Sequence, residues 1–126
     1  MLKIPATVNM VVKNEDRFIW YAIKSIIRFV DKVIITDTGS TDQTVKVIQN
    51  IHTNKIDFRQ ESVSSPWDIS QIRQQQLADT HTDWIWIVDG DEIYSAKLIK
   101  EIGKILKEKG NKMEGIVVGR RDLLGD

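Results

Sequence analysis

Four short apolar runs, each followed by a polar turn and then by a helical pattern, constrain the fold of this chain more than any other feature. The runs lie at residues 6–12, 32–36, 56–60 and 84–88, and helices are predicted at about 19–30, 41–51, 69–78 and 96–109. Strands that alternate with helices predict an α/β fold, with a mostly parallel sheet and right-handed crossovers. A fifth strand is expected at 115–119, and residues 1–126 are expected to form a single domain.

Local patterns refine this prediction. The run WIWIV at 84–88 is apolar on both faces, which predicts a central strand covered by helices on each side. Ser40 followed by Gln43 fits a capping box at the start of the second helix, and Gly110 fits the C-cap of the last helix. The polar stretch ESVSSPWD, with Pro66 as a break, predicts a longer loop before the third helix.

Composition excludes several classes of function. The chain has no cysteine, so disulfides, thiol nucleophiles and cysteine–zinc sites are ruled out. Its 18 basic and 18 acidic side chains cancel, so no long-range attraction to nucleic acid is expected. We expect no transmembrane segment and no cleavable signal, and therefore a cytoplasmic protein, with peripheral attachment to a membrane left open.

An acidic turn, Asp89-Gly90-Asp91-Glu92, follows the last of the four runs. Like charges crowded behind a buried strand favour a cation as the missing partner. Asp89 and Asp91 offer hard carboxylate oxygens that suit Mg²⁺ or Mn²⁺ bound together with a diphosphate, and Gly90 would let a ligand approach closely. The alternative is a solvated turn in which Asp91 or Glu92 caps the following helix.

Other known carboxylate loops fit this turn poorly. An EF-hand loop would need glycine and glutamate where the chain has Tyr94 and Lys100. The aspartate loop of haloacid-dehalogenase phosphatases would need threonine where the chain has Ile93. A carboxylate pair for a divalent cation therefore remains the better reading of the turn.

The remaining polar and aromatic residues leave alternatives open. Asp37, at the end of the second strand, is placed to accept hydrogen bonds from a nucleobase or ribose, although a turn and helix cap there need no ligand. Arg73 is placed to meet a phosphate, although an isolated arginine is more often solvated. Two further groups are expected to be structural or surface residues: Trp67, Trp84 and Trp86 as core or loop-anchoring aromatics, and His52 and His81 at the surface.

Four ordered motifs carry a family resemblance over about residues 5–99: VVKNEDRFIWYAIKSI, VIITDTGSTDQTVKV, PWDISQIRQQQLA and DWIWIVDGDE. In this order they resemble the family 2 glycosyltransferases of the GT-A fold. The resemblance implies a Rossmann-like nucleotide-diphospho-sugar transferase fold. It also implies transfer of a sugar, with inversion, from a nucleotide-diphosphate donor, a UDP-sugar being favoured. The acceptor, whether glycan, lipid or protein, stays unknown.

The resemblance also implies roles for single residues. Asn14 and Glu15 would border the nucleotide pocket, Asp37 and Thr38 would face the base or ribose, and Arg73 would approach the nucleotide or diphosphate. Asp89 would contact the ribose or the metal, Gly90 would lie beside the donor, and Asp91 would hold Mn²⁺ or Mg²⁺.

Departures from the family pattern define what stays open. Thr38 and Gln74 replace an aspartate and an asparagine that many relatives have, while Gly90 in place of alanine is expected to be harmless. Relatives continue well beyond this length, so we expect a chain truncated on its C-terminal side, with the general base in the missing part and the catalytic residues unknown. A nucleotidyltransferase would show a glycine-rich loop where the chain has KNEDRF. A non-catalytic module that binds a nucleotide-sugar or a partner remains the alternative.

Overall fold

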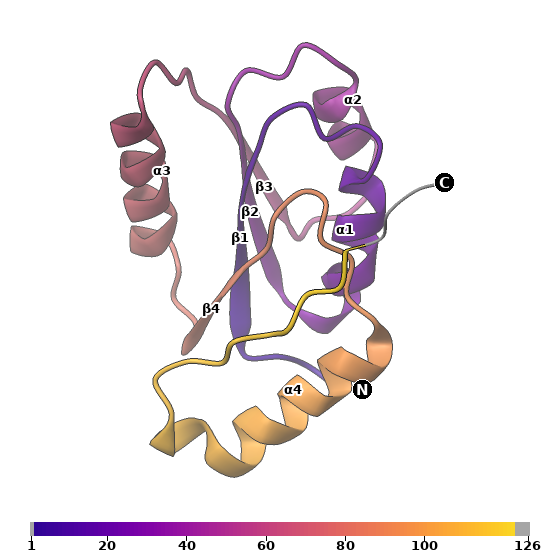
Figure 1. Ribbon diagram of the computed structural model, residues 1–126, viewed down its shortest axis with the longest axis vertical. Coiled ribbons are helices and arrows are strands. Elements are labelled where there is room, and N and C mark those ends of the chain that lie inside the picture. The colour runs from indigo at the N-terminus through magenta and orange to yellow at the C-terminus, as the bar shows by residue number, and fades with distance from the viewer. Residues whose placement is uncertain (1, 123–126) are drawn as a thin grey trace.

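The computed structural model describes residues 2–122 and contains a four-stranded sheet flanked by helices (Figure 1). The strands are β1 Ala6–Val12, β2 Lys32–Asp37, β3 Ile56–Gln60 and β4 Trp84–Ile87, in the spatial order β3-β2-β1-β4. The helices are α1 Ile19–Ile26, α2 Thr44–Gln49, α3 Pro66–Ala78 and α4 Ala96–Lys109, with short 3₁₀ turns η1 Ile27–Phe29 and η2 Gly110–Lys112. All three strand pairings are parallel, so the predicted α/β fold class is confirmed.

The two faces of the sheet differ in chemistry because side chains alternate along each strand. Alternate residues of β1, from Ala6 to Val12, enter an apolar core with β2 and with the buried sides of α1, α2 and α4. The intervening residues Thr7 and Asn9 face the side on which α3 lies (Figure 1). The α3 layer is therefore polar where the opposite layer is apolar.

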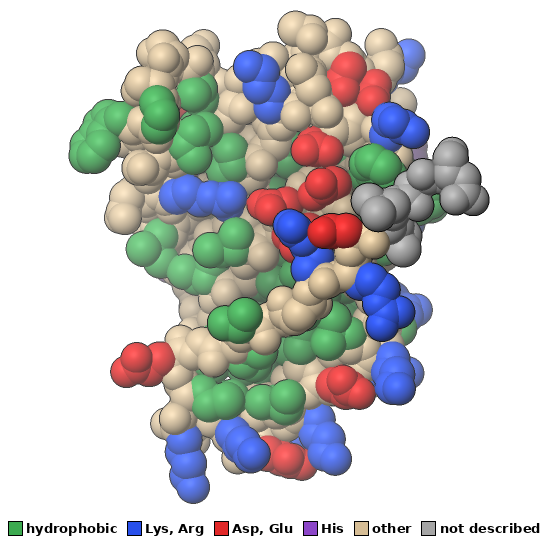
Figure 2. Space-filling view, in the orientation of Figure 1, with side chains coloured by type: hydrophobic (Ala, Val, Ile, Leu, Met, Phe, Trp, Pro, Cys, Tyr) green, Lys and Arg blue, Asp and Glu red, His purple; other side chains and the backbone are tan. Residues whose placement is uncertain are grey.

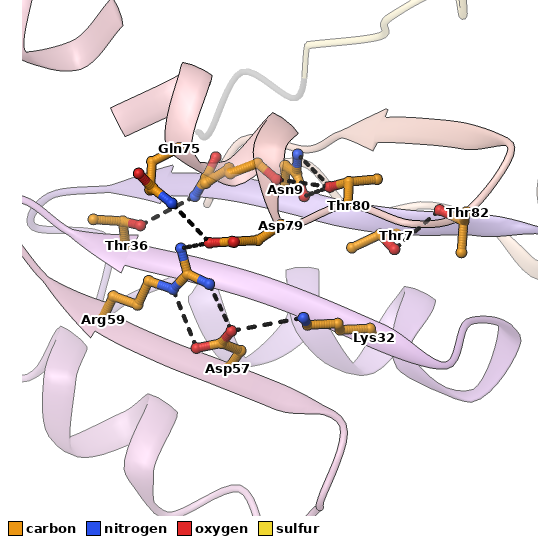
Figure 3. Close-up of polar contacts among 11 residues, drawn as sticks. Thr7, Asn9, Lys32, Thr36, Asp57, Arg59, Gln75, Asp79, Thr80 and Thr82 are labelled. Carbon is orange, nitrogen blue, oxygen red and sulfur yellow. Dashed lines mark hydrogen bonds and ion pairs between the residues drawn. The ribbon is translucent and has the colours of Figure 1, made fainter. Parts of the chain in front are cut away.

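Hydrogen bonds hold α3 on this polar face. Gln76 is fully buried, and its side-chain amide donates to the carbonyl oxygen of Met10 at 2.8 Å and to Thr36 Oγ1 at 3.1 Å. At the edge of this layer, Arg59 of β3 pairs with Asp57 at 2.8 Å and with Asp79, just after α3, at 2.7 Å (Figure 3). These contacts fix α3 across β1, β2 and β3.

Strand β4 departs from its prediction. It pairs with β1 and forms an edge of the described sheet, whereas an apolar pattern on both faces predicted a central strand. Trp84 and Trp86 pack against the core, but Ile85 and Ile87 are 38% and 60% exposed. An apolar pattern on both faces predicts that both faces of the strand are covered. Within residues 2–122, the face that carries Ile85 and Ile87 is only partly covered.

The fifth strand predicted at 115–119 is also wrong, because that segment is irregular. Helix α2 begins at Thr44, so Ser40 does not cap it. Helix α3 begins at Pro66, with Ser65 as N-cap and the Asp68 carboxylate accepting from the Ser65 backbone N–H at 3.1 Å. Proline fits the first helical position because that N–H has no partner within the helix, so Pro66 starts the helix and shortens the predicted loop.

Three smaller expectations have clear outcomes. Gly110 is the C-cap of α4, as predicted. His52 and His81 lie at the surface, also as predicted. Trp67 is 68% exposed in the first turn of α3, so it is neither a core residue nor a loop anchor.

Candidate functional site

The turns that follow β1 and β2 are tied to each other by backbone and side-chain hydrogen bonds. Asn14 has a left-handed backbone (φ 53°), donates from its N–H to Ser40 Oγ at 2.9 Å, and accepts from the Thr41 N–H at 2.8 Å. Glu15 donates from its N–H to Thr44 Oγ1 at 2.8 Å. The first junction is therefore held in place by the second, at the carboxyl edge of the sheet.

The Asp37 carboxylate organises the turn after β2. It is 1% exposed and accepts from the N–H groups of Gly39 at 3.1 Å and Ser40 at 3.0 Å, and also from the Ser40 hydroxyl. Gly39 takes a positive φ of 104°, which favours glycine. The Ser40 hydroxyl, which the sequence predicted as a helix cap, therefore donates to Asp37 instead.

Thr38 joins the end of β2 to the end of β1 through hydrogen bonds. Its N–H and its hydroxyl both donate to the carbonyl oxygen of Val12, at 3.0 and 3.2 Å. Its side chain is 7% exposed. Asp37 and Thr38 both lie at the carboxyl edge, where the sequence placed them, and both are engaged by the protein itself.

The acidic turn after β4 is closed by its last residue. Glu92 accepts from the Asp89 N–H through its side chain at 2.7 Å and donates its own N–H to the Asp89 carbonyl at 3.1 Å. Asp89 and Asp91 are exposed. Ser95 is the N-cap of α4, accepting from the Leu98 N–H at 3.2 Å. The alternative in which Asp91 or Glu92 caps the following helix is therefore wrong.

Gly90 brings this turn against the first junction. A Cβ atom built on Gly90 would lie 2.9 Å from Glu15 Cγ, which is too close for packed atoms, and 3.2 Å from Val12 Cγ1, which is tight. The close approach expected for a ligand is made here by the protein's own Glu15. Glycine at this position leaves room for Glu15 and Val12, and an alanine here would need these neighbours to shift.

Like charges meet at this contact. Burial raises the pKa of the Glu15 carboxyl, and the negative charges of Asp91, Asp89 and Asp42 raise it further. Figure 2 shows acidic side chains gathered near the middle of one face, with basic side chains beside them. The sequence placed Glu15 at the nucleotide pocket but gave no sign that it joins the acidic turn.

Arg73 faces the same turn from α3. The guanidinium is half-buried and donates to the carbonyl oxygen of Asn9 at 3.4 Å. Burial lowers its pKa, while the charge of Asp89 acts in the opposite direction. A partly desolvated cation beside Asp89 is placed to pair with an anion that reaches the edge of β1 and β4.

Asp89 and Asp91 meet the requirements of a divalent cation only in part. Within residues 2–122 no three His, Asp or Glu side chains are grouped as a cation site would need. Mg²⁺ and Mn²⁺ often use one or two carboxylates and complete their shell with water and phosphate oxygens. The exposed pair Asp89 and Asp91 fits a cation shared with a phosphate ligand, and does not fit one held by protein groups alone.

Two arginines beside the acidic turn, Arg120 and Arg121, were not predicted from the sequence. The segment after α4 returns along the acidic turn, and a cavity of about 360 Å³ is lined by Asp91, Glu92, Phe18, Arg120 and Arg121 among others. Arg120 and Arg121 lie far from the four motifs in sequence and follow no periodic pattern. Only the path of the chain after α4 brings them to this edge.

Comparison with known proteins identifies the family of this chain. A model of "Glycosyl transferase family 2" matches residues 7–123, which is nearly the whole chain. The chain belongs to this family. A glycosyltransferase of Rickettsia felis, described as uncharacterized, is 35% identical over 104 residues, covering 81% of this chain and 33% of that protein. A Rickettsia bellii glycosyltransferase, likewise uncharacterized, is 34% identical over 95 residues, covering 74% and 30%.

Solved structures of other proteins share the fold of this chain. S. aureus TarS superposes with a TM-score of 0.65 at 18% identity, covering 85% of this chain and 33% of that one. TarS has been crystallised with UDP and with UDP-GlcNAc. These neighbours establish the GT-A fold for this chain. The chain spans about a third of the length of the curated relatives it matches.

Proposed function

We propose that the carboxyl edge of this family 2 glycosyltransferase binds a nucleotide-diphosphate sugar, with a UDP-sugar as the favoured donor, for transfer to an acceptor with inversion. The observation that carries this function is the convergence of Asp89 and Asp91 on Glu15, with the Arg73 cation beside Asp89. An edge of this kind is where ligands of parallel α/β sheets bind. The TarS complexes with UDP and UDP-GlcNAc support the choice of donor.

The assigned roles divide along the edge. The turn built by Asn14, Asp37 and Thr38 would border the nucleoside, since its backbone is fixed before any ligand arrives. Arg73 would bind the diphosphate, to which its half-buried guanidinium offers fixed donors. Asp89 would contact the ribose or the metal, with Gly90 beside it.

Metal binding is proposed for Asp89 and Asp91, with Mn²⁺ or Mg²⁺ as the ion. When bound, such a cation would supply positive charge to the departing nucleoside diphosphate. Asp89 and Asp91 would hold the cation, while Arg73 would bind the diphosphate. Glu15 would add negative charge to the same edge, which strengthens the attraction for a cation.

A module that binds the nucleotide-sugar without transferring it is the second candidate. It would need only the donor site that Arg73, Asp89 and Asp91 form at the carboxyl edge. Both candidates need the same donor site, so donor binding is the first property to measure.

Calorimetric titration with UDP and UDP-GlcNAc, with and without Mn²⁺, tests the site. We expect the unmodified protein to bind only in the presence of Mn²⁺. Asp91→Asn should bind more weakly, and Mn²⁺ should no longer increase its affinity. Asp83→Asn is the matched control, because Asp83 is an exposed aspartate just before β4, at its other end. Metal-independent binding, or equal loss in both variants, would rule out the proposed metal role.

Sugar release separates the two candidates. Hydrolysis or transfer of the sugar from UDP-GlcNAc, followed by release of UDP, would identify an active transferase. Metal-dependent binding with no turnover over long incubation favours the binding module. A folded protein that binds neither UDP nor UDP-GlcNAc would exclude a UDP-sugar donor for both candidates.

A further inference from the structure

The outer side of α1 gathers aromatic and basic side chains in the solvent. Trp20 and Tyr21 are 46% and 55% exposed, and Arg17, Lys24 and Arg28 are exposed as well. We call these five residues the aromatic–basic face. Phe18, 43% exposed, lies at its border with the acidic edge. Figure 1 shows α1 on the opposite side of the sheet from α3.

Helical geometry places these residues together and keeps them outward. At 100° per residue, Trp20, Tyr21 and Lys24 fall within one arc of the helix. The opposite arc holds Ile19, Ala22, Ile23 and Ile26, all fully buried in the core. Rotating α1 to hide its aromatics would expose these four residues, so the exposure of Trp20 and Tyr21 is built into the fold.

The charge of this face is of one sign. Residues 17–30 contain three basic residues and no acidic residue, in a chain whose net charge is zero. The acidic residues on either side are engaged elsewhere. Asp31 pairs with Lys3 at 2.8 Å, and the Asp16 carboxylate accepts from the Gln43 N–H at 3.2 Å. Within residues 2–122 neither carboxylate forms an ion pair with Arg17, Lys24 or Arg28.

The aromatic and basic groups also contact one another. The Lys24 ammonium lies 5.7 Å from the Trp20 ring centre, and the rings of Trp20 and Tyr21 meet edge to face at 5.1 Å. Tryptophan and tyrosine prefer the region where a bilayer meets water, because each ring is apolar with a polar tip. Helices that lie on membranes combine such rings with lysine and arginine.

We propose that the aromatic–basic face binds an anionic lipid surface. Arg17, Lys24 and Arg28 would contact headgroup phosphates, and Trp20 and Tyr21 would enter the headgroup region. Three basic residues with no acidic residue among them complement an anionic surface, which favours lipid over a second copy of a chain whose net charge is zero. This attachment does not depend on sugar transfer. Within residues 2–122 no helix is long and apolar enough to span a bilayer, so the face would bind the surface only.

Vesicle flotation tests this surface. The purified protein is mixed with vesicles of phosphatidylcholine alone, or of phosphatidylcholine with phosphatidylglycerol, at low and high salt. We expect binding to the anionic vesicles, weakened by salt. Lys24→Glu should lower the partition coefficient by more than about fivefold, the contribution of one basic residue near an anionic surface. Trp20→Ser with Tyr21→Ser should remove the binding that persists in high salt.

Matched controls separate this face from general charge and exposure. Lys109→Glu makes the same charge change at the far end of α4, and Trp67→Ser removes an aromatic of greater exposure on α3. Both should bind vesicles as the unmodified protein does, with folding checked by circular dichroism.

Three outcomes would overturn the inference. The first is a folded protein that does not bind anionic vesicles, and the second is a loss of binding in Lys109→Glu equal to that in Lys24→Glu. A dimer in solution that Trp20→Ser dissociates would instead assign this face to a second copy of the chain.

Discussion

Gly90 lies against Glu15 so closely that a Cβ atom on Gly90 would stand 2.9 Å from Glu15 Cγ. This contact joins the turn after β4 to the turn after β1. It brings the carboxylate of Glu15 near those of Asp89 and Asp91, although Glu15 is far from them in the chain. The acidic edge is therefore a product of backbone packing as well as of the acidic residues themselves.

Gly90→Ala should destabilise the protein by about 1–3 kcal/mol, because the added methyl group overpacks a filled contact. Urea unfolding measures this free energy. Gly115→Ala is the control, since nothing lies within 4 Å of a Cβ there. In a double-mutant cycle, Glu15→Ala should recover part of the loss by removing Cγ. Full stability in Gly90→Ala would show that the turn moves away without cost.

Glu15→Gln should stabilise the protein at neutral pH and have little effect in acid. Burial and neighbouring carboxylates raise the pKa of Glu15 in the folded state, so the folded state binds more protons than the unfolded state once pH exceeds the ordinary value of 4.5. Stability contributed by protonated Glu15 is thus lost as pH rises through the folded pKa. Thermal melts of both proteins across this range measure the difference. A difference that shrinks as pH rises would contradict the assignment.

Asp37→Asn should cost about 1–3 kcal/mol whether or not a donor is present. The carboxylate is buried and accepts three hydrogen bonds, and an amide replaces one acceptor oxygen by a donor that faces these groups. Chemical unfolding without ligand measures the loss. Asp83→Asn, at an exposed aspartate, should unfold as the unmodified protein does. Equal stability of all three proteins would mean that the turn does not depend on Asp37.

Arg59→Met should lower the free energy of unfolding by about 1 kcal/mol, reduced from a buried pair because Arg59 and Asp57 are partly exposed. Removing the guanidinium lets α3 lose its link to β3 and leaves Asp79 without its ion-pair partner, whereas Asp57 keeps Lys32 at 3.8 Å. Lys3→Met is the control. Its pair with Asp31 has the same 2.8 Å distance but is far more exposed, so its loss should not be measurable. Equal effects in the two variants would show that the Arg59 bridge adds nothing to α3 docking.

Misplaced elements show which signals sequence carries. The apolar run in β4 was recognised, but its position at the edge was not, because apolarity on both faces records what a strand can bury and not what pairs with it. Ser40 fitted a helix cap by spacing, yet it binds Asp37, since a hydroxyl near a tight turn has several partners within reach. Local patterns located these elements, while competing partners decided their ends.

The sequence by itself determined the alternation of strands and helices, the order of the four motifs, the place of Asn14, Asp37 and Asp89 at strand ends or just beyond them, and the place of Arg73 on the third helix. These features follow from periodicity and turn chemistry, which act over a few residues. The tertiary structure alone decided that Glu15 meets the acidic turn, that Asp37 is buried in its own turn, and that Arg120 and Arg121 return to the same edge. Burial, pKa shifts and close contacts depend on distances through space between segments far apart in the chain, and no local pattern encodes them.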